Sequence, residues 1–177
     1  MAHVGELPPI SRHITAQDPQ SGKAVFLSTP PSDLKFAPLP VGRVAATLGY
    51  ATSGFPVDLN NGADLKAYEG HLETPPGLTI SNGSVLRIVD FAPASNGPMH
   101  ITESIDYGVV LEGQMEAALD SGETRLLKRG DIVVQRGTNH AWNNPSSTEW
   151  ARMLFVLIAA VTPITEKKVL EGESSEA

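Results

Sequence analysis

The amino-acid sequence predicts an all-β protein, and three features of the chain lead to that prediction. Beyond Ser84 the chain divides into short segments whose hydrophobic residues follow strand patterns. Turn-forming residues such as Asp, Asn, Gly and Pro separate these segments at close, regular intervals, which is typical of a β-sandwich or β-barrel. No helical pattern lies between them, so a parallel sheet built from βαβ units is excluded.

Residues 1–83 are rich in loops. The 16 Gly and 14 Pro residues of the chain interrupt this part repeatedly, which disfavours long helices. Short strands are expected at Ala24–Leu27 and Arg43–Tyr50, and a short helical turn at Ala63–Tyr68. We therefore expect an N-terminal strand and loop extension that packs on the barrel or on a partner subunit.

The barrel core is expected at residues 84–162. Ser84–Phe91 alternates, with Val85, Arg87 and Val89 on one face, as in a strand with one buried face. Residues 163–177 are polar and are expected to form a frayed tail, so the chain makes one structural domain in all. Six further strands are predicted at Tyr107–Leu111, Gln114–Leu119, Thr124–Leu127, Ile132–Gln135, His140–Asn143 and Arg152–Ile158.

The composition excludes several classes of function. The chain carries 13 Lys and Arg against 20 Asp and Glu, a net charge of −7, which is unsuited to binding nucleic acid or an anionic membrane. It contains no cysteine, so disulfides, a thiol nucleophile and cysteine-based metal sites are excluded. The longest apolar run, Met153–Val161, is too short to span a bilayer, and we recognise no targeting segment. A cytoplasmic location is therefore expected.

Two of the five histidines lie in strand contexts within the β-rich half, namely His100 and His140. If both face the barrel interior they need polar partners, because burying an imidazole without one is costly. Asp106 is the better-placed carboxylate, since Glu103 would lie on the opposite face of its strand from His100. The other histidines are predicted to be surface residues: His3, His13 and His71.

Two stretches of the β-rich half, Ala94–Gly113 and Gly130–Asn144, resemble the two motifs of the cupin superfamily in order and separation. The matching positions are Ala94, His100, Thr102, Asp106 and Gly113 in the first motif, and Gly130, Gly137, His140 and Asn144 in the second. The resemblance implies a cupin-type jelly-roll barrel with a small-molecule pocket at one end.

In metal-binding cupins, two histidines and a glutamate of the first motif join the histidine of the second to hold a divalent ion. Here Thr102 replaces one histidine and Asp106 replaces the glutamate. The remaining set is His100, Asp106 and His140, the two-histidine, one-carboxylate combination of the non-haem iron facial triad. The resemblance therefore implies a bound divalent metal (Fe, Mn, Zn or Ni) as one hypothesis, with no organic cofactor. Because Asp is shorter than Glu, ligation would require the Asp106 strand to lie closer in.

A metal-free pocket is the alternative hypothesis. His100 and His140 would then act as an acid/base pair, Asp106 would orient one of them, and Tyr107 would donate a proton. In a third hypothesis the histidines only contact polar groups of a bound ligand.

Further residues are predicted to line the pocket. Arg87 would bind a substrate carboxylate, and Arg136 at the pocket mouth would neutralise an anion. The other predicted ligand-binding residues are Thr102, Trp142, Met99 and Phe155.

The sequences of Met99–Tyr107 and Gln135–Asn143 are similar to those of a subgroup of single-domain cupins from fungi and bacteria. Some members of that subgroup are associated with specialised-metabolite pathways. That resemblance implies a lyase or isomerase that decarboxylates, dehydrates or cyclises a small oxygenated metabolite. A non-haem Fe(II) dioxygenase and a non-catalytic small-molecule-binding cupin are the alternatives. A homodimer is also expected, because the proline-broken N-terminal arm suits exchange between two copies.

Overall fold

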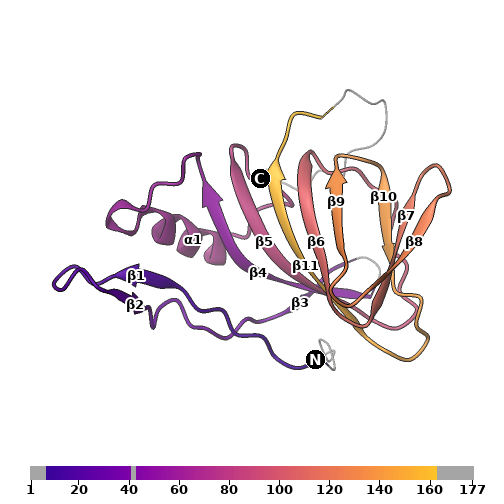
Figure 1. Ribbon diagram of the computed structural model, residues 1–177, viewed down its shortest axis with the longest axis horizontal. Helices are drawn as coiled ribbons and strands as arrows, with labels where there is room; N and C mark the ends of the chain where they lie inside the picture. The colour runs from indigo at the N-terminus through magenta and orange to yellow at the C-terminus, as the bar shows by residue number, and fades with distance from the viewer. Residues whose placement is uncertain (1–6, 41–42, 163–177) are drawn as a thin grey trace.

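The computed structural model describes residues 7–40 and 43–162. Its body consists of two β-sheets (Figure 1), one six-stranded in the order β3-β4-β5-β11-β6-β9 and one three-stranded in the order β10-β7-β8. All strand pairs in these sheets are antiparallel. The strands are β1 (Thr15–Gln17), β2 (Ala24–Phe26), β3 (Ala37–Pro38), β4 (Val44–Ser53), β5 (Gly83–Phe91), β6 (Ser104–Glu112), β7 (Gln114–Leu119), β8 (Thr124–Lys128), β9 (Ile132–Arg136), β10 (His140–Asn143) and β11 (Ala151–Ala159).

The hydrophobic core lies between the two sheets. Val85 on β5 and Met153 on β11 are completely buried from the larger sheet, and Met115 on β7 is completely buried from the smaller one. Trp142 on β10 belongs to the same buried cluster. Alternate residues of these strands face this core, as the two-residue period of a strand requires. The prediction of an all-β fold is confirmed.

Tight turns bring successive strands together. Gly113 connects β6 to β7 with φ +70°, and a Cβ there would lie 2.7 Å from the carbonyl oxygen of Trp150, so only glycine fits. Ala94 also adopts a positive φ of 53°. The first cupin motif, which this stretch resembles, has a glycine at this position. Ala94 adopts the same left-handed conformation despite its Cβ.

The N-terminal part covers the outer face of the larger sheet. Asp90 and Arg152, buried partners on β5 and β11, form a two-pronged ion pair with N–O distances of 2.5 and 2.7 Å. Arg152 also donates to the Pro8 carbonyl at 2.6 Å, and its guanidinium lies over the Phe36 ring. Helix α1 (Ala63–Glu73) packs against β4 and carries the buried Tyr68, whose hydroxyl accepts a hydrogen bond from Arg12.

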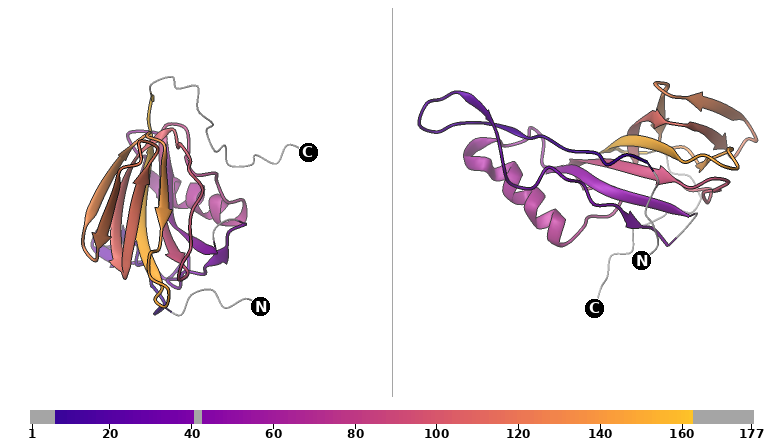
Figure 2. Two further views of the ribbon diagram at one scale, coloured as in Figure 1. Left: turned by 90° about the vertical axis from the view of Figure 1, so that its right-hand side faces the viewer. Right: turned by 90° about the horizontal axis from the view of Figure 1, so that it is seen from below.

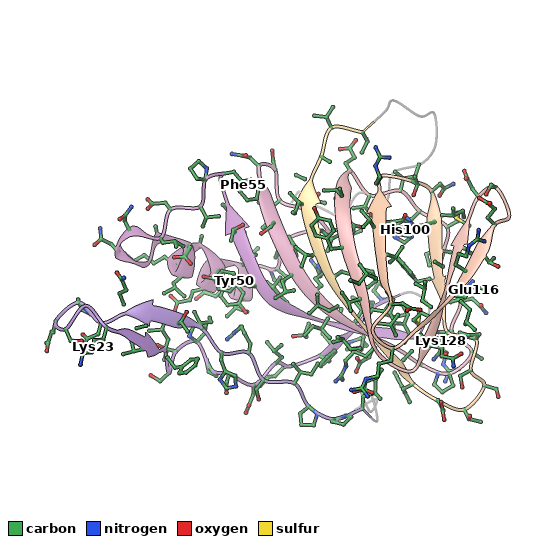
Figure 3. The ribbon with its side chains drawn as sticks, in the orientation of Figure 1. Lys23, Tyr50, Phe55, His100, Glu116 and Lys128 are labelled. Carbon is green, nitrogen blue, oxygen red and sulfur yellow. The ribbon has the colours of Figure 1, made fainter. Side chains whose placement is uncertain are left out.

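The β1–β2 hairpin extends away from the two-sheet body, with Lys23 near its tip (Figures 2 and 3). All three residues of β2 are exposed, and Phe26 is 75% exposed. The homodimer expected from the sequence stays a prediction. None of the described helices is long and apolar enough to cross a membrane.

The structure extends several predictions for the N-terminal part. The predicted helical turn is the first part of an 11-residue helix, α1, which carries His71 in its last turn. Strand β4 pairs along its length with β5, so residues 1–83 contribute an integral strand of the main sheet. The short strands β1 and β3 had not been predicted. His3 and the predicted tail at 163–177 lie outside the described residues.

Candidate active site

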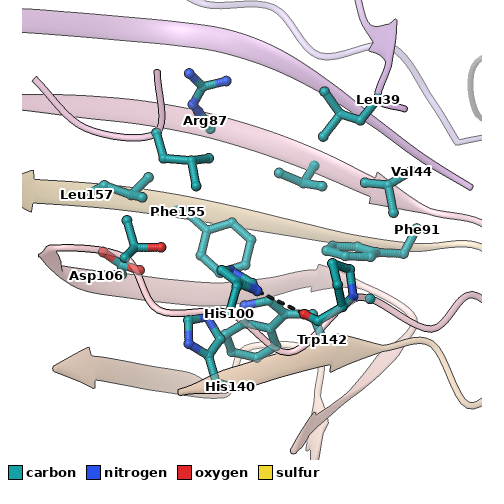
Figure 4. Close-up of a pocket in the computed structure, with 15 residues that line it drawn as sticks. Leu39, Val44, Arg87, Phe91, His100, Asp106, His140, Trp142, Phe155 and Leu157 are labelled. Carbon is teal, nitrogen blue, oxygen red and sulfur yellow. Dashed lines mark hydrogen bonds between the residues drawn. The ribbon is translucent and has the colours of Figure 1, made fainter. Parts of the chain in front are cut away.

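A cavity of about 180 Å³ opens between the two sheets (Figure 4). Most of its wall is apolar or aromatic, and the polar side chains come from three strands and from the segment before β6. The lining residues are Leu39, Val44, Leu78, Arg87, Val89, Phe91, Gly97, Pro98, His100, Thr102, Asp106, His140, Trp142, Phe155 and Leu157.

His100 and His140 lie side by side in this wall because their backbones form an isolated antiparallel bridge. The backbone N–H of each donates to the carbonyl of the other, at 2.8 and 2.9 Å. Residues paired in this way place their side chains on the same face. The two imidazole rings therefore lie with centroids 4.4 Å apart.

Both rings are oriented by backbone carbonyls. Nδ1 of His100 lies 3.0 Å from the Pro98 oxygen, and Nδ1 of His140 lies 2.8 Å from the Thr138 oxygen. A carbonyl only accepts, so each Nδ1 carries a proton, and Nε2 is the ring nitrogen left to face the cavity as an acceptor or donor. Burial lowers the pKa of His140 to about 4, outweighing the Thr138 hydrogen bond, which favours the charged form. His140 is therefore neutral near pH 7.

Asp106 supplies the carboxylate of the cavity. It projects from β6 and is buried, as are its neighbours Thr102 and Ser104. The Ser104 hydroxyl donates to Oδ1 of Asp106 at 2.5 Å. Burial raises the pKa of Asp106 to about 6, although the Ser104 hydrogen bond acts in the opposite direction. The carboxyl group can thus both take up and release a proton near neutral pH.

The structure also tests the expected set of metal ligands. Among residues 7–40 and 43–162, no three His, Asp or Glu side chains gather closely enough to hold one metal ion. His100 and His140 are adjacent, but Asp106 does not complete a set with them. The facial triad that the motif resemblance implied is therefore not assembled, and the residues do not fit that metal centre as they stand.

Arg87 lines the cavity from β5, across from the two histidines (Figure 4). Its Nη2 donates to the carbonyls of Pro76 and Gly77 at 2.8 and 2.6 Å. Burial lowers the pKa of Arg87, but a guanidinium remains protonated in proteins. The cavity thus contains a fixed positive charge.

Aromatic rings form the floor between these polar groups. Trp142 lies 5.6 Å from His140 and 5.4 Å from Phe155, measured between ring centroids. The Phe155 ring lies over Gly108, its cross-strand partner, where a Cβ would lie 3.1 Å from the ring edge. Glycine at that position therefore makes room for the ring.

Comparisons with known proteins show the family of the chain. The family model described as "Cupin domain" matches residues 87–157. Phomopsin biosynthesis cluster protein C' of Diaporthe leptostromiformis is 50% identical over 94% of this chain and 87% of its own. Cupin-domain-containing oxidoreductase fogC of Aspergillus ruber is 42% identical over 92% of this chain and 79% of its own. The chain belongs to the cupin family. Among solved structures, the polyketide cyclase RemF of Streptomyces resistomycificus matches with TM-score 0.50 and 20% identity, covering 75% of this chain and 79% of that one, which is a likeness of fold.

Three predicted site residues lie outside the cavity of this cupin. Tyr107 is 42% exposed on the face of β6 opposite Asp106, because neighbouring residues of a strand alternate. Arg136 is exposed at the end of β9 and borders a separate surface depression, so it does not lie at the cavity mouth. Met99 is 44% exposed and also lies outside the lining.

Other residues of the cupin site were not predicted from the sequence. The hydroxyl of Ser104 donates a hydrogen bond to the catalytic candidate Asp106. Ser104 could have been found from its spacing, because residues two apart in a strand share a face. The carbonyls of Pro98 and Thr138, which orient the two imidazoles, carry no side-chain signal.

Proposed function

We propose that this cupin catalyses a proton-transfer reaction of the lyase or isomerase type on a small oxygenated metabolite. One observation carries the proposal: a single apolar-walled cavity brings together a buried carboxylate, two adjacent imidazoles and a fixed guanidinium. Asp106, the histidine pair and Arg87 supply, respectively, a proton carrier, hydrogen-bond acceptors and a positive charge. These are the roles that breaking a C–H bond beside a carbonyl requires.

The residues divide the reaction between them. The ionised Asp106 removes a proton from the carbon beside the substrate carbonyl, and the electron pair of that C–H bond moves onto the carbonyl oxygen. Arg87 stabilises the resulting negative charge. Asp106 then returns the proton to a departing hydroxyl, which leaves as water, or to another carbon, which isomerises the substrate. Nε2 of His100 and His140 accept hydrogen bonds from a substrate hydroxyl and so orient it.

The relatives support a role in specialised metabolism. Two of them, each 50% identical to this chain, are named for the phomopsin biosynthesis cluster, and a third, 39% identical, is named for the oryzines biosynthesis cluster.

Deuterium incorporation tests the proposal. A panel of small β-keto and β-hydroxy carbonyl compounds is incubated with the protein in D₂O, and exchange of the C–H bond beside the carbonyl is followed by NMR. Asp106→Asn should reduce exchange by about 10²-fold or more. Tyr107→Phe, outside the cavity, is the matched control and should retain it. Exchange at the buffer rate for every compound, or full activity of Asp106→Asn, would refute the proposal.

An oxidoreductase is the second candidate, favoured by the printed names of relatives such as fogC. His100 and His140 share one feature of metal-ligating histidines, which commonly donate their other ring N–H to a carbonyl, but Asp106 does not complete a three-ligand set with them. Oxygen consumption that requires added ferrous ion together with His100 and His140 would favour this candidate. Turnover that persists in a strong chelator would exclude it.

A further inference from the structure

Arg87 occupies an unusual position for a cation. It lies in the middle of β5, paired with Phe155 on β11 and Leu48 on β4, in the centre of the main sheet. The segment between α1 and β5 holds one edge of its guanidinium, since Nη2 donates to the carbonyls of Pro76 and Gly77. The side chain is therefore fixed before any ligand arrives.

The Nε and Nη1 donors of Arg87 make no hydrogen bond to the described residues. Arginine has five N–H donors, of which Nη2 carries two. The Nε atom of Arg87 is buried and has no hydrogen-bond partner in the described part of the chain. Its Nη1 makes no hydrogen bond to those residues either. A buried donor without a partner is costly, so this edge suits an incoming acceptor.

Among residues 7–40 and 43–162, no carboxylate forms an ion pair with the positive charge of Arg87. The ion pair within the described residues joins Arg152 to Asp90, on the opposite face of the sheet. Asp106 lines the same cavity but makes no ion pair with Arg87. A neutral carbonyl would satisfy the free donors of Arg87 but would leave its partly buried charge uncompensated. An anion would satisfy the donors and compensate the charge.

We infer that the substrate of this cupin is a small planar carboxylate whose carboxyl group binds the free edge of Arg87. This rests on the proposed function and deepens it, because it names the group that anchors the substrate beside Asp106, while a neutral carbonyl of the same substrate receives the electron pair. The ring or conjugated chain of the substrate then lies against Phe155 and Trp142, and its reactive carbon faces Asp106.

The dimensions of the cavity limit the substrate further. A dry protein cavity of about 150 Å³ holds a benzene molecule. The cavity here measures about 180 Å³, which accommodates one six-membered ring and little more than its carboxyl group. Longer substrates would have to extend through the open side of the cavity.

Benzoate and benzyl alcohol are suitable probes because they differ mainly in charge. Calorimetric titration of the wild-type protein should show that benzoate binds at least tenfold more tightly than benzyl alcohol. Arg87→Met should weaken benzoate binding by about 10- to 100-fold and abolish this preference, because a hydrogen-bonded charge contact is lost. Arg125→Met removes the same charge from an exposed strand position and should preserve it.

Several outcomes would overturn the inference. It fails if the wild type shows no benzoate binding, if it shows no preference for benzoate, or if Arg87→Met keeps the preference. Should Arg87→Met not fold, Arg87→Lys replaces it, and an unchanged preference in that variant counts against the guanidinium fork. Asp106→Asn separates the two proposals. It should still bind benzoate when it has lost deuterium exchange, so failure of catalysis and failure of the carboxylate site are observed independently.

Discussion

Replacing Asp106 by Asn should stabilise the protein at neutral pH while removing its proposed activity. Burial raises the pKa of Asp106 from 3.8 to about 6, so the folded protein holds this proton more tightly than the unfolded chain does. Ionised Asp106 therefore costs stability above about pH 6, and the cost disappears as the pH falls towards 3.8. The pKa difference corresponds to roughly 3 kcal/mol, at about 1.4 kcal/mol per pKa unit. Asparagine remains neutral and can still accept the Ser104 hydrogen bond.

His140 responds to acid in the opposite direction. Its pKa falls from 6.5 in the unfolded chain to about 4 in the folded protein, so the folded state prefers the neutral ring. The stability contributed by His140 is complete above about pH 6.5 and is lost as the pH falls towards 4, again by roughly 3 kcal/mol. The two contributions nearly cancel in the wild type between about pH 4 and 6, and each single variant should expose the other.

Urea unfolding at four pH values between 7 and 4 measures these differences. Asp106→Asn should exceed the wild type by up to roughly 3 kcal/mol at pH 7 and approach it near pH 4. His140→Gln should instead gain on the wild type as the pH falls. Glu103→Gln, an exposed carboxylate three residues before Asp106, is the control and should give no pH-dependent difference. The reasoning is refuted if Asp106→Asn shows the same difference from the wild type at pH 7 and pH 4.

Three further substitutions test individual contacts. Ser104→Ala removes the hydroxyl that donates to the buried carboxylate of the cavity, so the acidic limb of the pH–activity profile should move to higher pH. An unmoved limb would show that this hydrogen bond does not tune the carboxylate. Asp90→Asn leaves Arg152 buried without its counter-charge and should cost about 3 to 5 kcal/mol in urea unfolding, with activity retained at low temperature. Gly108→Ala places a Cβ 2.9 Å from Cγ1 of Val133 and 3.1 Å from the Phe155 ring, so these side chains must shift. Because the Phe155 ring lines the cavity, benzoate binding should weaken in calorimetry; unchanged affinity would mean that Val133 alone moves.

Several strands could be predicted because turn-forming residues bound short segments with strand patterns. The bounds of Gln114–Leu119 and His140–Asn143 agree with β7 and β10. Strand β3, by contrast, has only two residues, both of them exposed, and leaves no pattern in the sequence. Helix α1 was predicted too short, because Tyr68 is its only fully buried residue and no apolar period marks its later turns.

The site could be predicted where the motif spacing fixes the strand face. The motif spacing predicted that His100 and His140 belong to the site. The backbone bridge between them explains why their rings lie side by side. The same spacing could not establish whether Asp106 lies close enough to join them in a metal centre. Nor could it show that Arg87 has free donors, because these depend on how the loop between α1 and β5 folds back to contact Nη2.

The bridge between His100 and His140 has a mechanical consequence. It joins the segment leading into β6 of the larger sheet to β10 of the smaller one, so the seam between the sheets runs through the site itself. A ligand that contacts Arg87 on the larger sheet and His140 on the smaller sheet would hold the two sheets together. Its binding should therefore slow hydrogen exchange at the amides of His100 and His140, which open only when the two sheets separate.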